Sequence, residues 1–121
     1  MYFLDMEVFK KSHSLTLFVY EITENFPSNK LMSLISQMQR AAISIPANLM
    51  EGVSRKSTKE FLRYVNISIG SASELFYYFY LSKDLRYITE ELFNSYENLN
   101  TEVLKLLYGL RRSLVQKLQT D

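Results

Sequence analysis

The chain has 121 residues, enough for one ordinary domain, and its 47% hydrophobic and 22% charged residues match average soluble usage, which excludes disordered and membrane classes. It contains no cysteine, which excludes disulfides, thiolate metal sites and a cysteine nucleophile and fits a reducing cytoplasm. The formal net charge of +1 is too balanced for strong non-specific attraction to nucleic acid.

The chain shows no export or membrane signal. Met1–Val8 contains acids and lacks a cationic start before an apolar run, so it does not resemble a secretory signal. The longest continuous apolar run, Leu75–Leu81, is far shorter than the roughly 20 residues that a bilayer span requires. We therefore expect a cytoplasmic protein that is not inserted into a membrane.

The first half of the chain predicts two helices. The first is expected from about Asp5 to Asn25, because Phe26-Pro27 follows and proline disfavours helix in the residue before it. The second is expected to end at Gly52 as a C-terminal cap and to bend at Pro46, which removes a backbone hydrogen bond. Apolar residues spaced alternately four and three apart mark its buried face: Leu31, Ile35, Met38, Ala42, Ile45 and Leu49.

The second half predicts two more helices. The third begins at the capping box Ser57-Thr58-Lys59-Glu60, and small residues around Gly70 allow another helix to approach closely. The fourth is expected from about Thr89 to Leu118, and its apolar stripe comprises Leu92, Tyr96, Leu99, Val103, Leu106 and Leu110. With so few glycines and prolines, the pattern predicts an all-α, up-down antiparallel four-helix bundle in a single domain of residues 1–121.

Five consecutive aromatic residues lie on the third helix: Phe76, Tyr77, Tyr78, Phe79 and Tyr80. At about 100° per residue they point to every side of the helix, so one bundle cannot cover them all. Tyrosine tolerates water at its hydroxyl, and base stacking is another possible use, but contiguous aromatic surface usually marks association. We therefore interpret the run as a subunit interface of a homo-oligomer.

A line of polar residues borders the apolar face of the second helix. Ser44, Asn48 and Glu51 recur at i, i+4 and i+7, and Arg55 continues the series beyond Gly52. Such a line is either a solvated edge or a structural polar network at the corner between the second and third helices, and we favour the network. The structural motif that results comprises Ser44, Pro46, Asn48, Glu51 and Gly52.

The residues required for common catalytic sites are missing. His13 is the only histidine, so the paired Glu-x-x-His motifs of di-iron bundles cannot be assembled. The sequence also contains no glycine-rich phosphate loop, no Gly-x-Ser-x-Gly elbow and no cluster of ligands with zinc spacing. We expect no catalytic residue, no cofactor, no metal and no small-molecule substrate, and hence no enzyme.

Several motifs along nearly the whole chain resemble the 23S ribosomal RNA intervening-sequence protein family, also called four-helix-bundle proteins. The main one is Gln37-Met38-Gln39-Arg40-Ala41-Ala42-x-Ser44-Ile45-Pro46-Ala47-Asn48-Leu49-x-Glu51-Gly52-x-x-Arg55, followed by Ser57-x-Lys59-Glu60-Phe61. Further matches are Phe26-Pro27, Gly70-Ser71-x-x-Glu74-Leu75 and Gly109-Leu110-x-x-Ser113-Leu114.

The resemblance implies an up-down bundle that assembles as a homopentameric barrel, as relatives of this fold do. One such relative is an accessory protein of diversity-generating retroelements that binds nucleic acid. Relatives commonly carry two arginines where this chain has Gln39-Arg40, so one positive charge is lost at Gln39. The remaining basic residues are the candidate contacts to RNA or DNA: Arg40, Arg55, Lys56, Lys59, Arg63, Arg111 and Arg112.

Two functions follow from these observations. The first is a non-enzymatic, homo-oligomeric accessory protein, pentameric by resemblance, in which the basic residues hold the phosphates of RNA or another nucleic acid. The alternative is a protein–protein interaction scaffold with no nucleic-acid role, which assembles through the aromatic residues of the third helix. The first function predicts binding that weakens steeply with salt, and the second predicts a co-purifying protein partner.

Overall fold

The computed structural model describes residues 2–120, apart from the side chains of residue 2 and residues 28–30. All the regular secondary structure in this part of the chain is helical. A 3₁₀ turn, Tyr2–Asp5, precedes α1. The four α-helices are α1 (Glu7–Thr23), α2 (Ser28–Ser54), α3 (Thr58–Asp84) and α4 (Glu90–Thr120).

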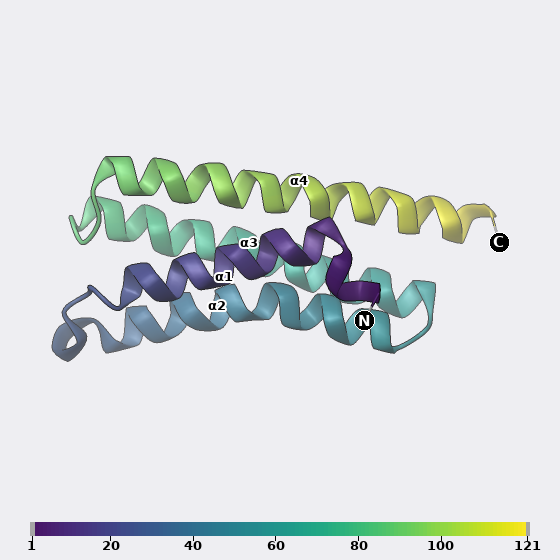
Figure 1. Ribbon diagram of the computed structural model, residues 1–121, viewed down its shortest axis with the longest axis horizontal. Coiled ribbons are helices and arrows are strands. Elements are labelled where there is room, and N and C mark those ends of the chain that lie inside the picture. The colour runs from purple at the N-terminus through teal and green to yellow at the C-terminus, as the bar shows by residue number, and fades with distance from the viewer. Residues whose placement is uncertain (1, 121) are drawn as a thin grey trace.

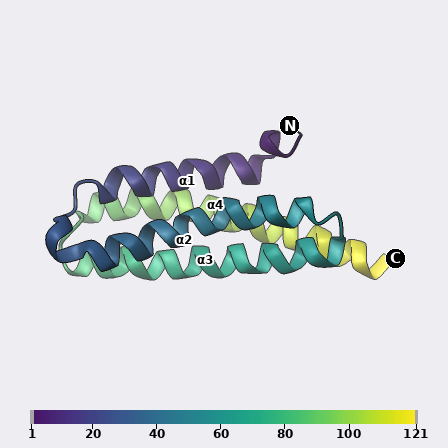
Figure 2. The ribbon, with the colours of Figure 1, turned by 90° about the horizontal axis from the view of Figure 1, so that it is seen from below.

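The four helices form an up-down antiparallel bundle, which confirms the predicted fold class (Figure 1). Each helix packs against its neighbours in sequence, and α1 also packs against α4 and thereby closes the bundle. In Figure 2 α2 lies in front of α4, with α1 and α3 to either side, so α2 and α4 are diagonal partners. The α2–α3 connection and the C-terminal end of α4 lie at the same end of the bundle (Figures 1 and 2). No helix formed by residues 2–120 combines the length and hydropathy needed to cross a bilayer.

The buried face of α2 agrees with the predicted stripe. Met38, Ala42, Ile45 and Leu49 have no exposed surface, because the four-three spacing keeps them on one side of the helix. In α4 the buried face agrees only in part with the predicted stripe: Tyr96 and Val103 are buried as predicted, and the other buried members are Phe93, Asn100, Leu107 and Leu114. The predicted leucines at its border, Leu92, Leu99, Leu106 and Leu110, are only half-buried.

Two residues of α4 with polar groups lie in the core: Tyr96, which the predicted stripe includes, and Asn100, which it does not. Asn100 donates from Nδ2 to the carbonyl of Ala72, 3.4 Å away, and the ring of Tyr96 stacks on Phe79 with centroids 3.7 Å apart. Among the described residues, neither the Tyr96 hydroxyl nor Asn100 Oδ1 has a hydrogen-bond partner. Burial raises the pKa of Tyr96 above its ordinary value, because a phenolate is poorly solvated there.

The expected C-terminal cap at Gly52 is wrong. Helix α2 continues through Gly52 to Ser54, and the left-handed residue of the connection is Lys56 (φ 57°). The helix keeps helical φ and ψ through Pro46, so no break in dihedral angles accompanies the bend expected there. Its one departure among the described residues is at Leu31 (φ −114°, ψ 15°).

The close helix approach occurs at Gly52 rather than at Gly70. A Cβ built on Gly52 would lie 2.8 Å from Phe61 Cδ1 and 2.9 Å from Tyr64 Cβ, so α3 packs directly on the α2 backbone. Gly70 is exposed, and a Cβ there would meet no atom within 4 Å. The small residues beside Gly70 do meet another helix, because the buried Ser68 donates to the carbonyl of Ile45 at 2.9 Å and Ser71 donates to the Ser44 hydroxyl at 2.7 Å, whereas Gly70 itself faces outward.

Candidate nucleic-acid interface

The connection between α2 and α3 is a rigid corner. Gly52 lets Phe61 and Tyr64 pack against α2, and Ser57 caps α3 by accepting a hydrogen bond from the Glu60 backbone N–H at 3.3 Å. This confirms the hydroxyl half of the predicted capping box. The corner therefore positions the backbone that carries its basic side chains.

Two of the candidate arginines meet on one tyrosine. The Tyr64 hydroxyl accepts a hydrogen bond from Arg55 at 2.8 Å, and the Arg55 guanidinium lies 5.3 Å from the ring centroid. The Arg63 guanidinium lies 4.5 Å from the same centroid, within the range of a cation–π contact. Because Tyr64 is buried, it holds both guanidinium groups at the surface of the corner.

Each of these arginines also has a carboxylate partner. Arg55 pairs with Glu51 at 3.2 Å, and Arg63 pairs with Glu60 at 3.3 Å. The hydrogen bond to Glu60 and its negative charge raise the pKa of Arg63 above the ordinary arginine value. Both pairs are exposed, so water screens them and they contribute little to stability. These two arginines remain cationic but are partly neutralised.

The two lysines of the corner lie beside the end of α4. Lys56 lines a groove of about 290 Å³ together with Phe61 from α3 and Lys117 from α4. Lys59 is exposed in the first turn of α3. Among the described residues neither Lys56, Lys59 nor Lys117 forms an ion pair, so this end of the bundle carries positive charge that no neighbouring acid neutralises.

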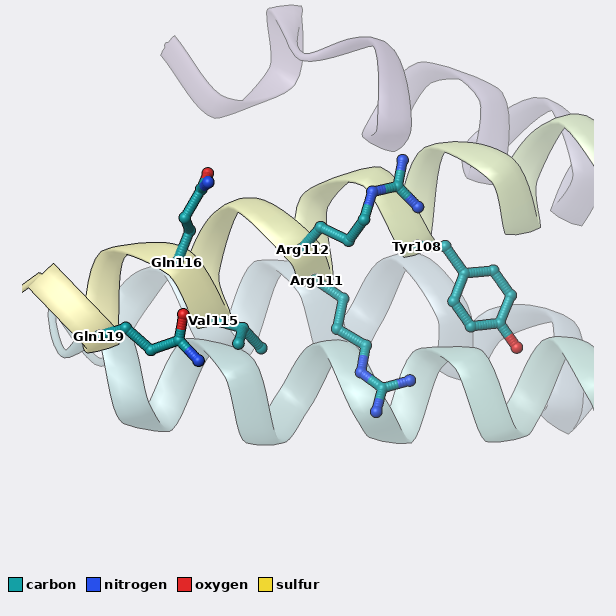
Figure 3. Close-up of a pocket in the computed structure, with 6 residues that line it drawn as sticks. All are labelled: Tyr108, Arg111, Arg112, Val115, Gln116 and Gln119. Carbon is teal, nitrogen blue, oxygen red and sulfur yellow. The ribbon is translucent and has the colours of Figure 1, made fainter.

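A larger groove of about 600 Å³ lies along the last turns of α4 (Figure 3). All of its lining side chains come from that helix: Tyr108, Arg111, Arg112, Val115, Gln116 and Gln119. In Figure 3 Arg111 and Tyr108 extend to one side of α4, and Arg112 and Gln116 extend to the other. No described residue pairs with either arginine. The groove therefore offers two guanidinium groups, two amides and a phenol to one ligand.

Arg40 does not join the other six candidate residues. It lies near the middle of α2 and lines a separate groove of about 310 Å³ with Gln37, Ser44 and Glu74. Its distance along the helix from Gly52 is roughly 18 Å at 1.5 Å per residue. The neighbouring Gln39 donates from Nε2 to Thr23 Oγ1 at 3.1 Å, so that position is engaged by α1.

The polar line on α2 divides into two hydrogen-bonded groups. Asn48 donates from Nδ2 to the carbonyl and the hydroxyl of Ser44, at 2.7 and 2.8 Å, and Ser71 of α3 donates to the same hydroxyl at 2.7 Å. Glu51 instead accepts from Arg55 and Ser54. The first group links α2 to α3 at mid-bundle, and the second lies at the exposed surface of the corner.

The aromatic run divides between core and surface. Phe79 is fully buried against α4, and two of the other rings are half-buried. Tyr77 and Tyr80 are 58% and 45% exposed. Phe79 is therefore unavailable to a second subunit, and the exposed part of the predicted interface is Tyr77 and Tyr80.

Sequence reasoning missed four residues that line the α4 groove, Tyr108, Val115, Gln116 and Gln119, and also missed Lys117 in the groove beside Lys56. The signal was present, because Tyr108, Arg112, Gln116 and Gln119 are spaced by four, four and three residues and share one face of a helix. Among residues 2–120 no three carboxylate or histidine side chains group into a metal site.

The comparison with family models gives a match to the 23S rRNA-intervening sequence protein over residues 4–109. The chain belongs to this family. The matched region includes the α2–α3 corner and Tyr108, but it ends before Arg111 and Arg112. No curated protein matches.

Five chains of solved structures match the bundle. One is a protein of unknown function from the S23 ribosomal protein family of Bacteroides thetaiotaomicron. It is 29% identical, with a TM-score of 0.79, and the alignment covers 86% of this chain and 97% of that one. The likeness therefore extends over nearly the whole of that chain.

Proposed function

We propose that this member of the family is a non-enzymatic, homo-oligomeric protein that binds RNA in the cytoplasm, with phosphates held at the end of the bundle where α2, α3 and α4 meet. The observation that carries the proposal is that six of the seven candidate cations, together with Lys117, lie on the α2–α3 connection, the first turns of α3 or the last turns of α4, and these segments meet at that end of the bundle (Figures 1 and 2). The family's name, which refers to 23S rRNA, supports RNA as the nucleic acid.

The chemistry of the α4 groove suits an unpaired RNA segment. Arg111 and Arg112 can each bind a phosphate through two parallel N–H donors. The amides of Gln116 and Gln119 can donate to and accept from base edges, and Tyr108, which is 40% exposed, offers a ring for stacking. Single-stranded segments expose both kinds of group, whereas a duplex hides its base edges in a narrow groove.

Self-association forms the second part of the proposal. The exposed rings of Tyr77 and Tyr80 lie on α3, and contiguous aromatic surface of this kind is typical of subunit interfaces. Five subunits are the number that the family resemblance implies. In a ring of this kind each subunit would add its own basic end, so several weak phosphate contacts would act together.

The test is a salt titration of RNA binding by the full chain, with a single-stranded RNA oligonucleotide and its duplex as probes. Five cations at the basic end make no ion pair among the described residues: Lys56, Lys59, Arg111, Arg112 and Lys117. If each neutralises one phosphate, affinity for the single strand falls roughly a hundredfold between about 50 and about 200 mM salt. The absence of binding at low salt would overturn the proposal.

A double variant, Lys56→Gly with Lys117→Ala, localises the binding. Glycine accepts the left-handed conformation of Lys56, so the charge is removed without backbone strain. The salt slope is expected to fall by about 1.4. An unchanged slope, or a protein rather than RNA as the co-purifying partner, would favour the interaction scaffold instead.

A further inference from the structure

The outer face of α2 carries an exposed stripe of apolar and small residues. Three of them are large: Met32, Ile43 and Met50 are 62%, 42% and 40% exposed. The small ones, Ser36, Ala47 and Ser54, are exposed between them. The stripe lies on the side of α2 opposite its buried face, and in Figure 2 this helix lies in front of its diagonal partner α4. No helix among the described residues covers it.

This stripe, here called the α2 seam, contains no charge. Helix α2 has only Lys30, Arg40 and Glu51 as charged residues in its 27 positions, and none of them is a member of the seam. By contrast, α4 carries eight charged residues in 31 positions. A solvent-facing helix surface is ordinarily rich in charge, so the seam has the composition of a covered surface.

The order of residues along the seam is self-complementary. Gln39 lies at the edge of the seam and is counted with it. The seam positions are then 32, 36, 39, 43, 47, 50 and 54, and the steps between them, 4, 3, 4, 4, 3 and 4, are the same from either end. If a second copy of α2 runs antiparallel with Ile43 opposite Ile43, then Met50 falls opposite Ser36 and Met32 falls opposite Ser54. Each methionine therefore faces a serine, and the two Ile43 side chains meet each other only at the axis, so that large and small side chains alternate along the pair and the two helices can interlock.

We infer that the α2 seam is the docking site for the α2 seam of a second copy of this chain, packed antiparallel about a two-fold axis at Ile43. Such an interface is isologous, because the same patch serves both subunits. The average spacing of about 3.7 residues per turn keeps the seam nearly straight along the helix, so the contact can extend from Ser36 to Met50.

This pairing is separate from both parts of the proposed function. The seam is on α2, whereas the exposed tyrosines are on α3 and the basic groove is on α4. A two-fold contact joins subunits in pairs, so it gives a dimer from single subunits and joins two rings if the tyrosine face forms rings. The RNA grooves stay exposed in either case.

The experiment uses thiol cross-linking, because the chain has no cysteine of its own. Ile43→Cys is treated with a short bifunctional maleimide at micromolar concentration, and a covalent dimer is expected as the main product. Ser36→Cys and Met50→Cys are expected to give a dimer only when the two variants are mixed. Two Ser36 positions lie roughly 21 Å apart along an antiparallel pair, so neither variant alone is linked.

Leu17→Cys on α1 is the matched control, since Leu17 is 57% exposed and lies outside the seam. It is expected to remain uncross-linked. A dimer from Ser36→Cys alone, or equal cross-linking of Leu17→Cys and Ile43→Cys, would overturn the antiparallel seam.

A charge placed on the axis provides a second test. Ile43→Lys brings two ammonium groups together, so the α2 contact is expected to dissociate while helical circular dichroism is unchanged. Sedimentation should then show half the wild-type mass. A mass equal to that of wild type would contradict the pairing. RNA affinity measured on the same variant tests the proposed function independently, because it depends on α4.

Discussion

The outer surfaces of α2 and α4 belong to diagonal helices of one bundle and have opposite chemistry. The α2 seam is free of charge and exposes Ile43 and Met50, whereas the last turns of α4 expose Arg111 and Arg112 beside two glutamines. Both helices bury a comparable apolar stripe on their inner side. The comparison teaches that the inner face determines the fold, and that the outer face of each helix determines what the bundle can bind.

The largest effect expected from this difference concerns RNA. Replacing Arg111 and Arg112 by alanine removes two charge-assisted contacts of about 1.5 kcal/mol each, so RNA affinity should fall about a hundredfold. Fluorescence anisotropy with labelled RNA at low salt measures the loss. Arg40→Ala is the control and should retain wild-type affinity, because Arg40 lies near the middle of α2. Equal losses in the two proteins would show that the α4 surface has no special role.

The next effect concerns the corner that joins α2 to the basic end. Gly52→Ala places a Cβ within 3 Å of Phe61 and Tyr64, and overpacking of this kind costs about 1–3 kcal/mol, offset by up to about 1 kcal/mol of helix propensity. Urea denaturation should therefore show a lower free energy of unfolding.

Gly70→Ala is the matched substitution on the same pair of helices. It meets open space and should raise the free energy of unfolding by about 0.5–1 kcal/mol. If both glycines respond with the same sign, the close approach at Gly52 is not the cause.

An effect of similar size to that of Gly70→Ala is expected in the core, which supports both surfaces equally. Tyr96→Phe removes a buried hydroxyl that has no partner among the described residues, so the free energy of unfolding should rise by about 1 kcal/mol. Tyr64→Phe deletes the hydroxyl that accepts the Arg55 hydrogen bond, so the free energy of unfolding should fall by a similar amount. RNA affinity should not change in Tyr96→Phe. Thermal denaturation of the two variants and of wild type shows whether each substitution raises or lowers the free energy of unfolding.

The fold follows from the sequence because apolar periodicity is a local property. The spacing from Met38 to Leu49 placed the buried face of α2 correctly, and the capping box placed the start of α3 at Thr58. What failed depended on contacts between helices. The sequence predicts a cap at Gly52, whereas in the structure its lack of a side chain accommodates Phe61 of the next helix.

The candidate site was only partly predictable for the same reason. Single basic residues were identifiable, but their grouping depends on the corner and on the length of α4. Lys56 and Lys117 are far apart in sequence and line one groove, while Arg40 is closer to Lys56 in sequence and lies apart from it. The α2 seam required knowledge of which residues the bundle covers, since Ile43 and Ile45 have the same chemistry and only one is buried.

The unequal lengths of α1 and α4 bear on how the basic end behaves. Helix α1 has 17 residues and α4 has 31, and beyond Leu107 the only described residue of α4 that is buried is Leu114. With so little apolar anchoring, the last turns should open more readily than the rest, and their amide hydrogens should exchange fastest. A ligand bound there would have to hold those turns closed, so part of its binding free energy would be spent on ordering the helix. Slower exchange confined to these turns would then mark the place where the ligand is bound.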